Sequence, residues 1–285
     1  MIEKFIHISA EKARELLERA KGKEHTKSGT DCRVSFVDDY AILKSNHIKL
    51  RNIETYDENL VYLDNLIESL IELKQKGVGV IPILGYCYDP NSHDGEGYII
   101  QPSAKGAELY DDSIMMPLYV YGQGNEISED CASYVLARTK TISEIPQAHF
   151  DKFVHDIIAI DEKDILIDFF GRSNFFYDSE AGFQFIDLNA HNDYHYGLME
   201  RRQPVEKIVA TFAFTPCHYS SQSKYLNNIA LSDESLSIFS AEELSQIAAC
   251  NRIAFKKCRA ALKHNGISDE EVEPILEKLK IYGLM

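Results

Sequence analysis

DFFGRSNFFYDSEAGFQFIDLN, residues 168–189, surrounds a short apolar hairpin with polar groups that could carry chemistry. The apolar runs NFFYD and FQFIDL are separated by SEAG, which predicts two short strands joined by a turn. Asp168 and Asn174 lie at or before the start of the first strand, and Asp187 lies near the end of the second. An ordinary β-hairpin and a catalytic, metal-binding segment both fit this pattern, so the rest of the chain has to distinguish them.

The first hundred residues predict a small β-sheet with one long helix inserted. The pattern indicates a helix over 10–21, two strands within 32–45, a long amphipathic helix over 57–76, and strands over 78–89 and 96–103. The pair Asp38-Asp39 marks the turn between the first two strands, and Gly77 ends the long helix.

The second half changes character and is mostly helical. It predicts helices over 147–162, 241–264 and 268–281, with short strands over 165–170, 174–178 and 183–188 between the first two. The change falls near 101–106. We therefore expect an α+β chain with an N-terminal lobe over 1–101 and a C-terminal lobe over 102–285.

Composition limits the partners that the chain can take. The 285 residues are 45% apolar and carry a formal net charge of −15. Such a chain repels phosphate backbones and anionic membranes, so nucleic-acid and membrane binding are poor expectations. A bound nucleotide would need local cations. No signal peptide is recognisable at the N-terminus, and the six Cys match no zinc-site spacing, so we expect a cytoplasmic protein with reduced thiols.

Two stretches of the N-terminal half bear on nucleotide binding. Lys44 ends the apolar strand YAILKS, where a rigidly held cation could neutralise phosphate charge. The other stretch, GYIIQPSAKGAELYDD, runs from an apolar strand into a short linker. Taken alone, Lys44 is also well explained as a surface lysine at a strand end.

In its order of elements and in these residues, the chain resembles the protein-kinase-like superfamily, which includes protein kinases and the aminoglycoside and choline phosphotransferases. The resemblance covers roughly residues 28–190. It implies a bilobal fold with a small antiparallel N-terminal sheet lobe and a mostly helical C-terminal lobe. ATP and Mg²⁺ are the cofactors that it implies.

The resemblance also implies roles for N-terminal residues. Lys44 would bind the α- and β-phosphates, and an acid of the helix over 57–76 would orient it. Glu68 is the first choice for this acid, with Glu58, Asp64 and Glu72 as alternatives. Gly29 would let the backbone approach the phosphates, although the full glycine-rich pattern is absent. Since Pro102 lacks an N–H, Ser103 or Ala104 would donate to the adenine edge.

In the C-terminal half, Asn174 and Asp187 would bind Mg²⁺, and Asp168 would orient or deprotonate the acceptor hydroxyl. Asp168 lies six residues before Asn174, where the family has five, and no His precedes it. Either the loop holds an extra residue or the general base is missing. Arg172 would offset phosphate charge in the transition state or pair structurally with Asp168.

The sequence thus favours an ATP- and Mg²⁺-dependent phosphotransferase that acts on a hydroxyl of an unidentified acceptor, with a small molecule slightly preferred over a protein. Two alternatives stay open. One is a pseudokinase that serves as a nucleotide- or protein-binding module, and the other is an α+β protein unrelated to kinases.

Overall fold

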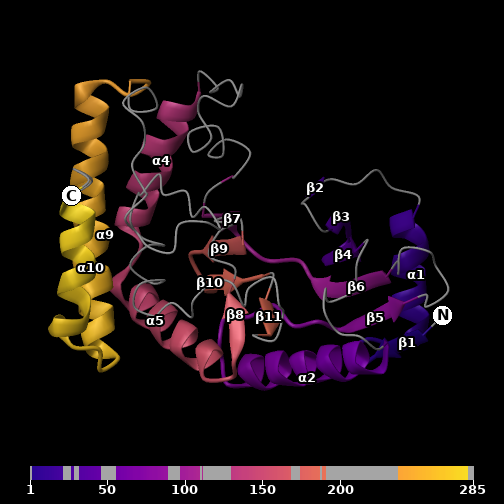
Figure 1. Cartoon of the computed structure of the whole chain (residues 1–285). Coiled ribbons are helices and arrows are strands. Elements are labelled where there is room, and N and C mark those ends of the chain that lie inside the picture. The colour runs from indigo at the N-terminus through magenta and orange to yellow at the C-terminus, as the bar shows by residue number, and fades with distance from the viewer. Residues whose placement is uncertain are drawn as a thin grey trace. The chain divides into compact units, whose positions relative to one another are not determined.

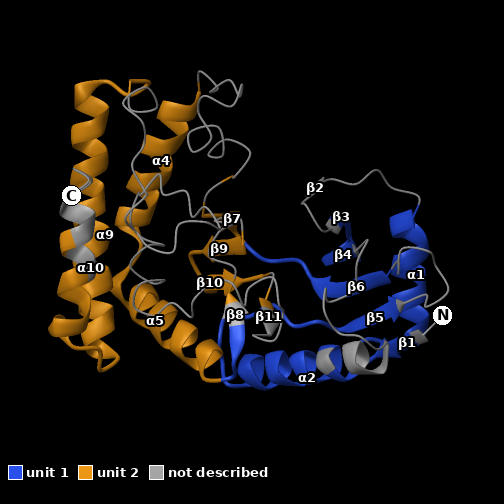
Figure 2. Cartoon of the chain, in the orientation of Figure 1, with its two compact units in different colours: residues 1–105, 163–165, 189–198 blue, residues 106–162, 166–188, 199–285 orange. Residues whose placement is uncertain are grey.

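A computed structural model describes most of the chain. The described residues are 2–21, 27–28, 32–45, 56–88, 97–109, 111, 130–167, 174–186, 188–190 and 237–281. By their contacts, the residues divide into two compact units (Figure 2). Unit 1 comprises 1–105, 163–165 and 189–198, and unit 2 comprises 106–162, 166–188 and 199–285.

Unit 1 contains a six-stranded antiparallel sheet and two helices (Figure 1). Its elements are β1 (Ile2–Phe5), α1 (Ala10–Lys21), β2 (Lys27–Ser28), β3 (Cys32–Val37), β4 (Tyr40–Ser45), α2 (Tyr56–Gln75), β5 (Gly85–Tyr88) and β6 (Gly97–Pro102). The strand order is β1-β5-β6-β4-β3-β2. The predicted α+β class, with a small antiparallel sheet and several helices, is confirmed.

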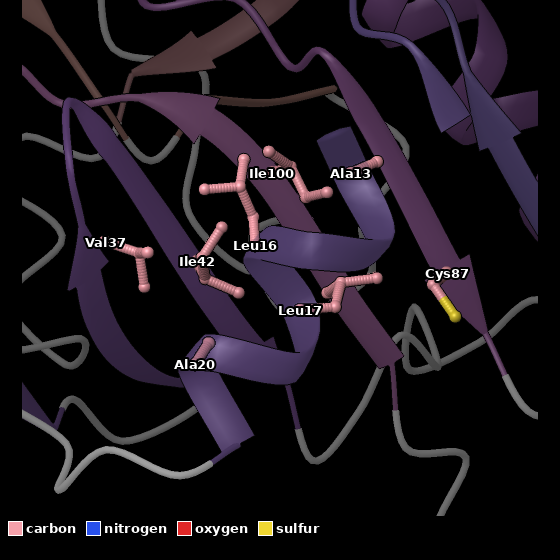
Figure 3. Packing of buried hydrophobic residues seen from close by; sticks show 8 residues of the cluster. All are labelled: Ala13, Leu16, Leu17, Ala20, Val37, Ile42, Cys87 and Ile100. Carbon is pink, nitrogen blue, oxygen red and sulfur yellow. The ribbon is translucent and has the colours of Figure 1, made fainter. Parts of the chain in front are cut away.

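Helix α1 covers one face of this sheet. Its apolar residues recur at helical spacing and are buried, so they form one stripe. The stripe packs on side chains from four strands, and the resulting cluster is drawn in Figure 3: Ala13, Leu16, Leu17, Ala20, Val37, Ile42, Cys87 and Ile100. This cluster is the core of the sheet on its α1 side.

Ion pairs fix α1 to the strands beneath it. Asp38, in the β3–β4 turn, adopts a φ of 53°, a left-handed conformation that Asp tolerates better than most residues. Both of its carboxylate oxygens accept hydrogen bonds from the Arg19 guanidinium, at 2.6 and 2.7 Å. Near the other end of the helix, Arg14 donates to Glu3 of β1 at 2.6 Å. The turn and the edge strand are thus both tied to α1.

Unit 2 is built from helices around a hairpin. Its elements are β7 (Ala107–Glu108), α4 (Cys131–Glu144), α5 (Gln147–Asp161), β9 (Phe175–Asp178), β10 (Gly182–Phe185), α9 (Ala241–His264) and α10 (Asp269–Ile281). The strands form a sheet in the order β10-β9-β7. A further two-stranded sheet pairs β8 (Ile165–Ile167) with β11 (Leu188–Ala190).

An aromatic cluster joins the hairpin to α5. Phe153 of α5 lies 4.7 Å from Phe183 and 5.5 Å from Phe185, measured between ring centroids. Phe175 is fully buried beside them. Burial of each such side chain contributes about 1.5–3 kcal/mol, so this cluster holds the hairpin on the helix.

Several sequence expectations were wrong in detail. The strand predicted over 78–89 is limited to β5, because Pro82 has no N–H to donate to a ladder. Residues 78–83 are nevertheless largely buried, which explains their apolar character. The elements β1, β7, β11 and α4 were not predicted at all.

Two other properties concern cysteine and membrane insertion. Cys87, Cys131 and Cys258 are buried, and none of them forms a disulfide within the described ranges. Burial raises the pKa of Cys131 to about 11 and also raises that of Cys258. Among the described residues, the helices are all too short or too polar to serve as a membrane span.

Candidate functional site

Two rows of residues cross the sheet of unit 1 on opposite faces. Strand pairing puts Glu3, Cys87, Tyr98, Lys44, Arg33 and Ser28 in one line, which we call the α1-face row. The neighbouring line, the α2-face row, holds Lys4, Tyr86, Ile99, Leu43 and Val34. Because successive side chains of a strand point to opposite faces, the two rows are separated by the sheet.

The faces are identified by what packs on them. Cys87 belongs to the core cluster beneath α1, and Tyr98 packs against that cluster. On the opposite face, the Tyr86 hydroxyl donates to the Asp64 carboxylate of α2 at 3.2 Å. Lys44, the sequence-predicted phosphate ligand, therefore lies on the α1 face. Leu43 occupies the corresponding position on the face that α2 reaches.

Asp64 is an acid of α2 that is bonded to the sheet. Besides Tyr86, it binds the Lys4 ammonium of β1 at 2.5 Å. Glu68, the first choice from sequence, is exposed. Asp64 was an alternative, but its partner Lys4 was missed, because the four-residue strand β1 is too short to predict from its pattern. The pairing of Lys44 with Glu68 stays a prediction.

Glu72, another alternative, links α2 to the turn that precedes β8. Its carboxylate binds Lys163 at 2.5 Å and Lys76 at 2.6 Å. The hydrogen bond from Lys163, followed by that from Lys76, lowers the pKa of Glu72 to about 2. Glu72 is therefore ionised throughout the physiological pH range and holds this turn to the helix.

The linker after β6 offers two polar groups. The Ser103 amide donates to the Asp39 carbonyl at 2.8 Å, so it is already engaged. The Ser103 hydroxyl oxygen is buried and has no hydrogen-bond partner among the residues that the structure describes. Within the described part of the chain, the Ala104 amide also makes no hydrogen bond. A buried hydroxyl and an adjacent unpaired amide suit the polar edge of a ligand.

Apolar side chains lie on the same sheet as this linker. Phe36 keeps 39% of its surface exposed, and Val34, Leu43 and Ile99 are half-buried. All four point to the α2 face. Val34, Leu43 and Ile99 belong to the α2-face row, and Phe36, two residues after Val34 on the same strand, points to the same side and pairs with Ala41. An aromatic base could pack on such a surface while its edge meets the linker.

In unit 2, the β9–β10 hairpin brings Asn174 next to Ile186. Phe175 pairs with Phe185, and the Ile186 amide donates to the Asn174 carbonyl at 3.0 Å. Asn174 therefore lies beside the residue that precedes Asp187. This proximity is what a shared metal site would require, although the carboxylate of Asp187 is outside the described residues.

Four predicted site residues, Gly29, Asp168, Arg172 and Asp187, lie outside the described ranges, so their roles stay predictions. Within those ranges, no group of three His, Cys, Asp or Glu side chains could hold a metal ion.

Arg33 is a further residue that sequence reasoning missed. It faces Lys44 directly across the β3–β4 pair. The sequence could have revealed this pairing. The turn at Asp38-Asp39 pairs Val37 with Tyr40, and counting back along both strands from that pair puts Arg33 opposite Lys44.

Comparison with known proteins gives little further guidance. No family model matches the chain, and no curated protein matches it. One similar solved structure is a co-crystal structure of WbdD with the kinase inhibitor LY294002, at 14% identity and a TM-score of 0.35. The match covers 90% of this chain, which spans about half (50%) of the length of that one. A likeness at this level assigns no family.

Proposed function

We propose that the chain is an ATP- and Mg²⁺-dependent phosphotransferase that transfers the γ-phosphate to a hydroxyl of an acceptor. The observation that carries the proposal is the linker after β6. Among the described residues, the Ser103 hydroxyl and the Ala104 amide are unpaired there, and the sheet from which the linker leads carries half-buried apolar side chains. That combination fits a purine base, with Ala104 as the donor to its edge because the Ser103 amide is engaged.

The order of elements supports the same proposal. Strand β4, which carries Lys44, pairs directly with β6, which leads into the linker. A ligand held at the linker could therefore extend along adjacent strands toward the end of β4. Helix α2 is inserted between β4 and β5, as the resemblance implies.

The remaining predicted residues take the following roles in this proposal. Lys44 would bind phosphate oxygens, and Gly29 would allow backbone approach. Asn174 and Asp187 would hold Mg²⁺, Asp168 orients the acceptor hydroxyl, and Arg172 offsets phosphate charge. ATP would supply the transferred phosphoryl group and Mg²⁺ would neutralise its charge. The protein mainly positions the reactants.

The acceptor is proposed only as a class. An acidic chain with a net charge of −15 attracts cationic molecules, and a small-molecule acceptor is slightly preferred over a protein.

A second candidate function is nucleotide or protein binding without transfer. The observation that favours it is the sheet register, which puts Lys44 on the α1 face and Leu43 on the apolar face where the base would pack. A nucleotide on that face would lack the strand-held cation beside its phosphates. The irregular spacing of Asp168 and Asn174 favours the same candidate.

Binding and turnover measured on the same samples separate the two candidates. Calorimetry with Mg-ATP reports binding, and release of ADP in the presence of candidate hydroxyl acceptors reports transfer. The phosphotransferase requires ADP release that Asp168→Asn reduces by at least about a hundredfold while Mg-ATP binding persists. Binding without any ADP release, unchanged in Asp168→Asn, would favour the binding module. Absence of binding would contradict both.

A further inference from the structure

The α1-face row contains two cations that face each other. Arg33 of β3 and Lys44 of β4 occupy directly opposite positions, and side chains so placed have Cβ atoms about 4.5–5.5 Å apart. Arg33 is exposed and Lys44 is half-buried. Like charges at opposite positions destabilise a sheet. In a chain with 45 acidic and 30 basic residues, this placement concentrates positive charge at one spot.

A third cation and a hydroxyl belong to the same neighbourhood. Tyr98 of β6 lies opposite Lys44 on its other side, so the order across the sheet is Arg33, Lys44, Tyr98. Lys21 ends α1, and its pKa is raised mainly by its hydrogen bond to Glu18 and to a smaller extent by the ionised forms of Tyr98 and Cys87, both members of the row, so it lies near them. The last turn of α1 thus brings Lys21 toward the end of the row at which Lys44 lies.

Three described carboxylates on or against α1 are paired with cations of that helix. Glu18 accepts from Lys21 at 2.7 Å, Asp38 accepts from Arg19, and Glu3, at the far end of the row, accepts from Arg14. Within the part of the chain that the structure describes, the Arg33 guanidinium forms no hydrogen bond or ion pair. Its donors are available for a ligand.

We propose that Arg33, Lys44 and Lys21, with the Tyr98 hydroxyl beside them, form a phosphate-binding site on the α1 face of the sheet. A guanidinium binds two phosphate oxygens at once, and the ammonium groups add point charges. A bound phosphate would be attracted to both Arg33 and Lys44. The ligand is a phosphate group, either of inorganic phosphate or of a nucleotide.

This site shares Lys44 with the proposed function, but its binding of inorganic phosphate does not require a nucleotide. The base of a nucleotide would pack on the opposite, apolar face, while the core cluster beneath α1 fills the middle of this one. A phosphate at Arg33 can therefore bind whether or not a nucleotide occupies the other face.

The test is calorimetric titration of the full chain with sodium phosphate, using sodium chloride at equal ionic strength as the reference. The variants are Arg33→Gln, the conservative Arg33→Lys, and Lys256→Gln, which removes an exposed cation from α9 of unit 2. We expect saturable phosphate binding by the wild type and by Lys256→Gln. Arg33→Gln should weaken it at least about tenfold, and Arg33→Lys should fall between them.

Thermal unfolding without phosphate gives an independent check that each variant folds. Because the Arg33 guanidinium forms no hydrogen bond or ion pair among the described residues, Arg33→Gln should melt no lower than the wild type in phosphate-free, low-salt buffer. Phosphate should then raise the melting temperature of the wild type more than that of Arg33→Gln. Absence of saturable phosphate binding by the wild type, or equal affinities of the wild type and Arg33→Gln, would overturn the site.

Titration of the same samples with Mg-ATP identifies the source of the phosphate. Weaker binding of inorganic phosphate to Arg33→Gln, with unchanged affinity for Mg-ATP, supports a site separate from the nucleotide. Loss of both supports a site that takes the phosphates of the nucleotide. Phosphate binding without any Mg-ATP binding supports this site and contradicts only the proposed function.

Discussion

Gly106 shows how one residue can be fixed by the approach of another strand. Its φ is +81°, and a Cβ built there would lie 2.1 Å from the Tyr177 carbonyl oxygen of β9. Neither the dihedral angle nor the contact can be relieved by a side-chain rotation. The glycine therefore permits β7 to pair with β9 directly after the linker.

We expect Gly106→Ala to lower the free energy of unfolding by about 3 kcal/mol or more, because positive-φ strain adds to a backbone clash. Urea denaturation measures the change. Gly182→Ala is the matched control in the same sheet, since Gly182 has a φ of +75° but nothing within 4 Å of the added Cβ. It should lose only about 1–2 kcal/mol. Equal losses in the two variants would show that the approach to Tyr177 does not matter.

Lys44 shows what sequence can and cannot establish about a single residue. Alternation places Lys44 and Ile42 on the same face of β4. Which helix covers that face depends on contacts between segments far apart in the chain, and no local pattern encodes them. The same limit explains why Asp64 could be named as one of several acids of the long helix, while its bonds to Lys4 and Tyr86 could not be foreseen.

At the scale of elements, Glu72 ties α2 to the turn before β8 through Lys163. The pKa of Glu72 is lowered to about 2 in the folded chain, from an ordinary value of 4.5. A lowered carboxyl pKa stabilises the folded state above the ordinary value, and this stabilisation is lost as the pH falls toward the folded value. The stabilisation by Glu72 should therefore disappear between pH 4.5 and about 2.

Melting temperature as a function of pH tests this link. The wild type should melt above Glu72→Gln at pH 6, and the difference should shrink steadily below pH 4.5. Lys163→Gln removes the main cause of the shift and should reproduce most of the effect. Because the carboxylate is exposed, added salt should reduce the difference at pH 6. A difference that does not change with pH would exclude the ion pair as its origin.

Helix α9 begins with a capping box. The Ser240 hydroxyl accepts from the Glu243 amide at 3.2 Å, and the Glu243 carboxylate accepts from the Ser240 amide at 2.8 Å. We expect Ser240→Ala to lower the free energy of unfolding by about 1 kcal/mol. Ser245→Ala, at an exposed position within the same helix, should leave it unchanged or slightly raised, because Ala favours helix interiors. Denaturant titration of both variants is the measurement, and a larger loss in Ser245→Ala would contradict the capping role.

Helices and strands could be predicted from sequence where a sufficiently long periodic pattern of apolar residues ended at a recognisable turn or helix end. The helix over 10–21 and the strands within 32–45 are observed with the expected bounds, because a buried stripe and a tight turn determine them locally. Strands β1 and β7 were missed, since four and two residues carry no period. The first is held by pairing with β5 and the second by pairing with β9.

At the scale of the whole molecule, the chain consists of two compact units. Unit 1 holds the apolar sheet face and the linker groups Ser103 and Ala104. Unit 2 holds Asn174, which the hairpin brings beside Ile186. The order of these parts along the chain could be read from sequence. The side of the sheet on which a phosphate binds could not, because it depends on packing between helices and strands.

The central prediction is that the chain binds a nucleotide in a metal-dependent way, and one titration tests it. Calorimetry of the full chain with ATP should give one binding event per chain in the presence of Mg²⁺. In EDTA, or in Asp187→Ala with Mg²⁺, the affinity should fall at least about tenfold, since a carboxylate ligand and the ion that it holds are both charged. Heats indistinguishable from dilution in all three titrations, or equal affinities with and without Mg²⁺, would contradict a kinase-like nucleotide site in this protein.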